Sequence, residues 1–141
     1  MEFVSVEALR PFYEGKKVLI TGGAGLIGSY TANALVEIGA EVIIYDLQKS
    51  NNPLITQIEG DIFDYGQLKS VMEGVEYVFH FAALLGVERI EKTPHDVLRV
   101  NLEGTINALK AANECKVKRF LFSSSSEVYG EPERIPISEE D

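Results

Sequence analysis

The sequence predicts an α/β fold, namely a doubly wound, Rossmann-type parallel sheet of about five strands with helices on both faces. Strand-like and helix-like segments alternate from residue 17 to residue 125. The strand-like runs are short and almost continuously apolar, as in parallel strands that helices bury on both faces. A glycine-rich stretch separates the first strand from the first helix, which is typical of doubly wound sheets that bind nucleotides.

Each expected strand is an apolar run of four to seven residues bounded by glycines or polar residues. The five runs are KVLIT at 17–21, EVIIY at 41–45, a weaker one at 55–59, EYVFHFA at 76–82 and RFLF at 119–122. The connections between them are long enough for right-handed crossovers. The fifth strand is expected to form an exposed, partly apolar edge of the sheet, because no further strand follows it in the sequence.

Three helices are expected between these strands. The first covers 26–38, with Ile27, Ala34, Leu35 and Ile38 on one apolar face and Gly39 as its stop. The second begins at Asp64, which with Gln67 three residues later resembles a capping box, and reaches about Glu73.

The third and longest helix is expected to begin at Thr93-Pro94, with the threonine as N-cap and the proline in the first turn. Its predicted apolar stripe comprises Leu98, Leu102, Ile106 and Leu109. We therefore divide the chain into an N-terminal extension (1–16), a Rossmann domain (17–130) and a loop (131–141) that leads to a missing C-terminal part.

Composition and charge exclude several classes of protein. The chain has 141 residues and a net charge of −9, which disfavours a nucleic-acid partner or a polybasic membrane surface. No apolar run is long enough to span a membrane. The single cysteine, Cys115, indicates a reducing compartment, and we expect a cytoplasmic protein. With His80 in a buried strand and His95 in a helix, and no acid or cysteine at ligand spacing, we predict no metal site.

The glycine-rich stretch LITGGAGLIGS at 19–29 contains the chemistry that a dinucleotide requires. Gly22, Gly25 and Gly28 give a tight turn, a close backbone approach to a pyrophosphate and close packing of helix on strand. The pyrophosphate would then lie at the helix N-terminus. Asp46 follows the last glycine by 46 − 28 = 18 residues. A carboxylate there accepts ribose hydroxyls and repels a 2′-phosphate, so NAD is favoured over NADP.

Five motifs occur in the order typical of one family: VLITGGAGLIGS at 18–29, Gly-Asp-Ile at 60–62, His-Phe-Ala-Ala at 80–83, Asn101 with Gly-Thr at 104–105, and SSSSEVYG at 123–130. Together they resemble the extended short-chain dehydrogenase/reductases, in particular the nucleotide-sugar epimerases and dehydratases. The resemblance covers nearly the whole chain beyond its first dozen residues.

The resemblance implies NAD as the cofactor and assigns residues to it. Asp61 and Ile62 would lie on the adenine, although an aspartate at a strand end also caps turns. Asn101 would face the nicotinamide side, the alternative being a solvent-facing helix residue. The full cofactor-binding set is Gly22, Gly25, Leu26, Ile27, Gly28, Asp46, Asp61, Ile62, Ala82, Ala83, Asn101 and Ser123.

The same resemblance selects Ser125 as the catalytic serine, whose hydroxyl would bind the sugar oxygen that is oxidised or reduced. Glu127 is either a general base, a polar contact to substrate or an exposed loop residue. The dehydratases of the family have Asp-Glu after this serine, whereas this chain has Ser126-Glu127, which disfavours dehydration. Ser-Glu also occurs in decarboxylases of the UDP-glucuronate type and in some epimerases, so both reactions stay open.

The shared chemistry of the family would be transient hydride transfer from a sugar carbon to NAD, assisted by a Tyr-x-x-x-Lys pair. No such pair follows Gly130, so we expect these 141 residues to bind NAD without turnover. The complete enzyme would bind a nucleotide sugar and form a homodimer. Two other classes stay open: a non-catalytic NAD-binding module, and an interaction domain without a cofactor, which the glycine loop disfavours.

Overall fold

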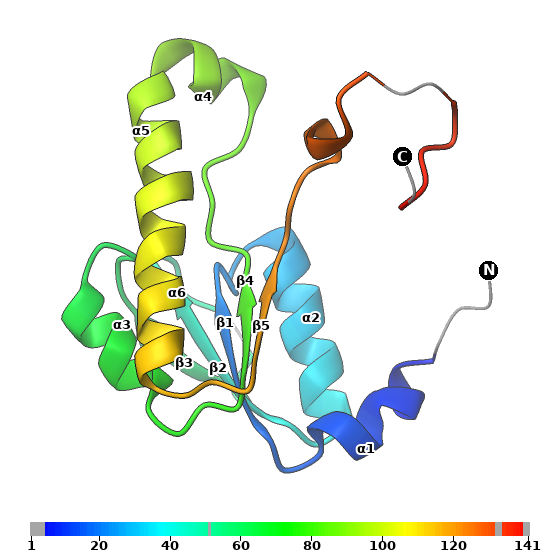
Figure 1. Cartoon of the computed structure of the whole chain (residues 1–141). Coiled ribbons are helices and arrows are strands. Elements are labelled where there is room, and N and C mark those ends of the chain that lie inside the picture. Colours follow the sequence, from blue (N-terminus) through cyan, green and yellow to red (C-terminus); the bar gives the residue numbers. More distant parts are fainter. Residues whose placement is uncertain (1–4, 51, 132–133, 140–141) are drawn as a thin grey trace.

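The fold was examined in a computed structural model, which describes residues 5–50, 52–131 and 134–139. Within these residues the chain forms a five-stranded parallel sheet in the order β3-β2-β1-β4-β5. The strands are β1 (Lys17–Thr21), β2 (Glu41–Asp46), β3 (Thr56–Glu59), β4 (Tyr77–His80) and β5 (Arg119–Phe122). Because β1 lies in the middle and the chain winds outward from it in both directions (Figure 1), the doubly wound fold predicted from the sequence is confirmed.

The strand register brings the carboxyl ends of the strands together. Thr21 of β1 pairs with Tyr45 of β2 and with His80 of β4, and His80 pairs in turn with Phe122 of β5. The loops that follow these strands therefore meet at one edge of the sheet, where ligands bind in open α/β folds.

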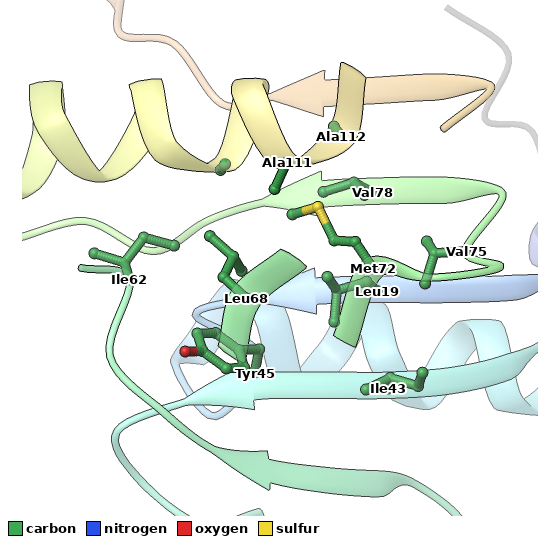
Figure 2. Packing of buried hydrophobic residues seen from close by; sticks show 11 residues of the cluster. Leu19, Ile43, Tyr45, Ile62, Leu68, Met72, Val75, Val78, Ala111 and Ala112 are labelled. Atoms are coloured by element: carbon green, nitrogen blue, oxygen red, sulfur yellow. The ribbon is translucent and has the colours of Figure 1, made fainter. Parts of the chain in front are cut away.

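Alternate residues of the strands point to opposite faces, and each face has its own core. On one face α2 (Leu26–Glu37) packs its Ala32 and Leu35 against Val18 and Ile20 of β1. On the other face, α3 (Tyr65–Met72) and α6 (Thr105–Glu114) lie side by side. Figure 2 shows Leu68 and Met72 of α3 between the strands and the alanines of α6. The prediction of helices on both faces is thus confirmed.

The long helix after β4 has three parts: α5 (Pro94–Leu98), a π-helical segment η2 (Arg99–Gly104), and α6. It is preceded by the short α4 (Val87–Lys92). The π segment closely approaches the loop after β3 at Gly104, where a Cβ atom would lie 2.8 Å from the Ile62 side chain. Thr93 is the N-cap residue and Pro94 the first helical residue, as expected, but the Thr93 hydroxyl donates back to the carbonyl of Arg89 at 3.3 Å and makes no side-chain cap. The hydrophobic periodicity of the sequence does not predict the π-helical segment, whose hydrogen bonds span one residue more than those of an α-helix.

The predicted apolar stripe of this helix is also wrong, because it faces outward. Its four members, Leu98, Leu102, Ile106 and Leu109, are all exposed. The helix instead packs its small residues, Gly104, Ala108, Ala111 and Ala112, against the sheet and α3. Small side chains allow the close approach of helix to sheet that large ones would prevent.

Ile27 was expected on the apolar face of the first helix, but its side chain is 64% exposed. Gly28 takes the buried place in the first turn, since a Cβ there would lie 2.4 Å from the carbonyl oxygen of Gly22. At the other end of this helix the prediction is confirmed: Ile38 is buried and Gly39 has a φ of +83°.

Other boundaries differ by one or two residues. β2 includes Asp46, β3 begins one residue late, and β4 is shorter at both ends than the apolar run 76–82. The Asp64 cap is confirmed, because its Oδ1 accepts the N–H of Gln67 at 2.9 Å. The Gln67 amide donates to the carbonyl of Glu59 instead of completing a capping box.

The N-terminal extension forms a short 3₁₀ helix η1 (Val6–Leu9) and the single turn α1 (Arg10–Tyr13). Tyr13 packs its ring 5.1 Å from that of Tyr77, and Arg10 donates to the carbonyl of Glu37 at the end of α2. Among the described residues β5 forms the edge of the sheet beside β4, as expected, and its Phe122 is 56% exposed. None of the helices in the described ranges combines the length and the apolar character that a membrane span requires.

Candidate functional site

The turn between β1 and α2 is built from glycines, and at Gly22 and Gly28 a side chain would strike the backbone. Gly22 has a φ of +70°, and a Cβ on it would lie 2.6 Å from the backbone of Phe81 and Ala82. Its N–H donates to the carbonyl of Tyr45 at 3.0 Å. The turn therefore touches the ends of β2 and β4 at once, and this contact requires both the left-handed conformation and the absence of a side chain.

The same turn places the N-terminus of α2, a helix of twelve residues, at the carboxyl edge of the sheet. Gly25 is the N-cap of α2 and offers no side chain to its first turn. The N–H groups of that turn and the positive end of the helix dipole are consequently available to an anion. Leu26 and Ile27 are exposed beside them. A local site for an anion thus exists in a chain whose net charge is −9.

Asp46 is fixed at the carboxyl end of β2 next to this turn. Its Oδ2 accepts the N–H of Ala24 at 3.0 Å, and its Oδ1 accepts the N–H of Gln48 at 2.9 Å. Two backbone donors hold the ionised carboxylate and set its orientation. The acid expected from the glycine-acid spacing is therefore next to the glycine turn.

A first cavity of about 380 Å³ lies against these groups. Gly22, Gly25 and Asp46 line it on one side, and the loops after β3 and β4 line the rest. Four residues from those loops were predicted from the sequence as cofactor-binding: Asp61, Ile62, Ala82 and Ala83. The structure thus brings most of the predicted set together around one cavity. This volume lies in the range of small-molecule sites.

Asp61 both borders this cavity and caps its own turn, since its Oδ1 accepts the N–H of Phe63 at 2.9 Å. Its carbonyl accepts the hydroxyl of Tyr45 at 2.8 Å. Tyr45 is buried, and burial, together with the nearby carboxylates of Asp64 and Asp61, raises its pKa to about 12. Tyr45 is therefore a neutral hydrogen-bonding part of the cavity wall.

A second, smaller cavity of about 250 Å³ continues along the same edge toward β5. Ala82 and Ala83 border both cavities, and Asn101, Ser123 and Ser125 border the second. The Asn101 side chain accepts the N–H of Leu84 at 2.8 Å and donates to its carbonyl at 3.0 Å. The alternative that Asn101 faces solvent is therefore wrong. Ser123 Oγ donates to the carbonyl of His80 at 3.5 Å.

His80 lies under this second cavity and is 2% exposed. Its Nδ1 lies 2.7 Å from Thr21 Oγ1, and its Nε2 lies 3.0 Å from Thr105 Oγ1. Burial lowers its pKa to about 4, so the ring is neutral at pH 7. Sequence reasoning treated His80 as an ordinary buried strand residue and missed its two threonine partners. In the described part of the chain no group of three His, Cys, Asp or Glu residues could hold a metal ion.

Ser125 and Glu127 are both exposed. Ser125 borders the second cavity, and its Oγ accepts the N–H of Glu127 at 3.3 Å as the cap of the short helix η3 (Ser126–Tyr129). Glu127 is not among the residues that line either cavity.

Three Tyr-x-x-x-Lys spacings do occur earlier in the sequence, at Tyr13 with Lys17, at Tyr45 with Lys49 and at Tyr65 with Lys69. Lys17 Nζ donates to the carbonyl of Glu73, and Lys69 pairs with Glu114 at 2.5 Å. Of these residues only Tyr45 lines either of the two cavities along the carboxyl edge, and its hydroxyl donates to the carbonyl of Asp61.

Several lining residues were not predicted: Leu47, Gln48, Phe63, Leu84, Arg89 and Val100. Leu47 and Gln48 directly follow Asp46, so their place at a strand end could have indicated them. Arg89 and Val100 reach the cavity from α4 and η2, whose paths depend on the π segment. No local sequence pattern indicates that path.

Comparison with known proteins agrees with this geometry. The sequence model of the NAD dependent epimerase/dehydratase family matches residues 18–141. A UDP-glucose 4-epimerase from Halalkalibacterium halodurans is 40% identical over 130 residues, which are 88% of this chain and 39% of that protein. The chain spans about 40% of the length of the first curated relatives it matches.

Two solved structures are similar throughout the shared region. The epimerase Mth375 from Methanothermobacter thermautotrophicus is 37% identical with a TM-score of 0.88, and the alignment covers 100% of this chain and 45% of that one. A UDP-glucose 4-epimerase from Brucella ovis, solved in complex with NAD, is 36% identical with a TM-score of 0.81, over 90% of this chain and 41% of that one.

Proposed function

Because the chain belongs to the NAD dependent epimerase/dehydratase family, we propose that it binds NAD and forms the cofactor-binding portion of an enzyme that epimerises nucleotide sugars. The observation that carries the proposal is the glycine turn, fixed against β2 and β4, with the Asp46 carboxylate held beside it by two backbone N–H groups. This is the arrangement that a pyrophosphate and its neighbouring ribose require.

The two cavities suggest the orientation of the dinucleotide. The adenosine occupies the first cavity, with its ribose hydroxyls on Asp46 and its adenine near Asp61 and Ile62. The pyrophosphate crosses the glycine turn at the N-terminus of α2. The nicotinamide occupies the second cavity, between Ala83, Asn101 and Ser123.

When bound, NAD would accept and return a hydride at a sugar carbon. The chain's own part is to bind and orient. Ser125, at the rim of the nicotinamide cavity, would donate a hydrogen bond to the sugar oxygen at the reacting carbon. Glu127 would act on substrate as a polar contact or proton acceptor, because it lies two residues from Ser125 on an exposed turn.

The names of the relatives favour epimerisation over the other reactions of the family, since the first matched are UDP-glucose 4-epimerases. We therefore propose a UDP-sugar as the substrate of the complete enzyme, and decarboxylation of a UDP-uronate as the alternative that Ser-Glu at 126–127 leaves open. We also propose a cytoplasmic location, from the single cysteine, and a homodimer, from the exposed stripe of the long helix.

Calorimetric titration of the chain with NAD and with NADP tests the cofactor assignment. We expect one saturable site for NAD and weaker binding of NADP, because a 2′-phosphate would lie against the Asp46 carboxylate. Equal affinity for both nucleotides would contradict the role of Asp46, and no binding of either would contradict the proposed function.

Turnover is tested separately by incubating the chain with UDP-glucose and NAD and measuring UDP-galactose. We expect none from these 141 residues, because no Tyr-x-x-x-Lys pair follows Gly130 and no earlier pair has both of its residues lining a cavity. Sustained epimerisation by this polypeptide would show that another group moves the proton.

A further inference from the structure

We propose that His80, as the neutral imidazole protonated on Nε2, is a positioning residue. Acting through Thr105 and Asn101, it holds the partition between the two cavities, namely the wall segment from Ala82 to Leu84. This inference rests on the proposed function, because the partition matters only if one dinucleotide spans both cavities. Five groups from β1, β4, the loop after β4 and the long helix make up the connection: Thr21, His80, Ala82, Asn101 and Thr105.

The direction of every hydrogen bond in this connection follows from Thr105. Its hydroxyl has one proton, which it donates to the carbonyl of Asn101 at 2.7 Å. At its 3.0 Å contact with His80 the same oxygen must therefore accept, so Nε2 carries the proton. In a neutral ring Nδ1 is then the acceptor, and Thr21 donates to it at 2.7 Å.

Thr21 extends the connection to the cavity wall. With its proton committed to His80, its oxygen is free to accept, and it accepts the N–H of Ala82 at 3.4 Å. Ala82 borders both cavities. Protonation of Nδ1 would force the Thr21 hydroxyl to turn its proton away from the ring and to accept there instead, so the neutral ring is the form that matches the hydrogen bonds assigned above.

At its other end the connection fixes the π segment. The Thr105 hydroxyl bonds the Asn101 carbonyl one turn earlier, and the Asn101 side chain holds the Leu84 backbone through two bonds. Leu84 lines the first cavity and Asn101 lines the second. His80 thus joins the two ends of the wall, Ala82 and Leu84, through the sheet and the long helix.

The ring of His80 also stacks on Phe122, with an interplanar angle of 20° and centroids 6.1 Å apart. Packing alone would explain a buried aromatic residue here. Substitutions of Thr105 distinguish packing of the His80 ring from its hydrogen bonding. Thr105→Val keeps the shape of the side chain and removes the hydroxyl, whereas Thr105→Ser keeps the hydroxyl. Ile43→Val serves as a control for lost stability, since Ile43 is buried in the same core and lines neither cavity.

Nitrogen NMR of the His80 ring in the full chain at pH 7 tests the tautomer without any ligand. We expect a proton on Nε2 and none on Nδ1, and slow hydrogen exchange of the Leu84 amide. The Leu84 amide should exchange faster in Thr105→Val and stay protected in Thr105→Ser and Ile43→Val. A proton on Nδ1, or unchanged exchange in Thr105→Val, would overturn the proposal.

Titration with NAD then tests the consequence for binding. We expect Thr105→Val to lose affinity about tenfold, with Thr105→Ser and Ile43→Val within about twofold of the wild type. Equal affinity of wild type and Thr105→Val would overturn the positioning role. If the wild type does not bind NAD, the proposed function fails, and the ring tautomer and Leu84 exchange still decide whether His80 holds the wall.

Discussion

The glycine turn and the serine run lie at the same edge of the sheet, yet the chain holds them very differently. Gly22 touches two strands, Gly28 is buried, and Asp46 beside them is fixed by two backbone donors. Ser125 and Glu127 lie on an exposed turn, where the Ser125 hydroxyl accepts the N–H of Glu127 as the cap of η3. The difference indicates that the binding end, the glycine turn with Asp46, is preorganised, whereas the reactive end, Ser125 with Glu127, is loosely held. Substitutions at the binding end should therefore change stability and NAD affinity more than substitutions at the reactive end.

The largest effect is expected at the binding end, from Gly22→Ala. The new Cβ would meet the backbone of Phe81 and Ala82, just after β4, at 2.6 Å in a left-handed conformation, so we expect a loss of about 4 kcal/mol in the free energy of unfolding. NAD binding should disappear. Urea unfolding and calorimetry measure both effects.

Gly66→Ala is the matched control for that substitution. Gly66 lies in the first turn of α3, where a Cβ would meet nothing closer than 3.6 Å, so alanine should raise stability by up to about 1 kcal/mol. A similar loss in both variants would contradict the special role of the turn.

The next effect is the pH dependence of stability that we expect from His80. The pKa of His80 falls from 6.5 to about 4 on folding, so between these values the unfolded chain binds a proton that the folded chain does not. Stability should therefore decrease as the pH falls from about 6.5 to 4, by about 3 kcal/mol in total.

Unfolding curves at several pH values measure this slope, and His80→Phe isolates it, because a phenyl ring can stack on Phe122 but does not titrate. The slope in this range should be smaller in the variant. An unchanged slope would assign the pH dependence to other groups.

A smaller effect is expected from Asp46→Asn. One of the two backbone donors at Ala24 and Gln48 would then face an amide N–H instead of an oxygen, costing about 1–2 kcal/mol of stability. NAD affinity should fall about tenfold while the preference for NAD over NADP narrows. Parallel titrations with the two nucleotides measure the ratio, and an unchanged ratio would separate Asp46 from the ribose.

The smallest effect is expected at the reactive end, from Ser125→Ala. The lost hydroxyl accepts one exposed N–H at 3.3 Å, so stability should change by less than about 0.5 kcal/mol. NAD affinity should stay within about twofold of the wild type. A large loss of NAD affinity would show that the serine run belongs to the cofactor site and is held more firmly than its exposure indicates.

The same contrast explains how far the sequence could predict the molecule. The strands and the glycine turn depend on local patterns, namely apolar runs and fixed glycine spacing, and these predictions are confirmed. The face of the long helix was predicted wrongly, because its large residues point outward and its alanines pack inward. Which face a helix buries depends on how close its neighbours lie, and that is a property of the assembled fold.

The candidate site shows the same division between local and assembled features. Asp46 was expected from its spacing to Gly28 and lies beside the turn. The connection through Thr21, His80 and Thr105 joins residues 25 and 59 positions apart in the sequence. Thr21 and His80 are buried and Thr105 is half-buried, and none of the three stands out by itself. Only the pairing of β1 with β4 and the π segment of the long helix bring them together.

The most direct test of the central claim is a crystal structure of this chain with NAD. We predict adenosine in the cavity at Asp46 and Asp61, the pyrophosphate over Gly22 and Gly25, and the nicotinamide in the cavity at Asn101 and Ser123. NAD bound in the reverse direction, or away from the glycine turn, would contradict the account.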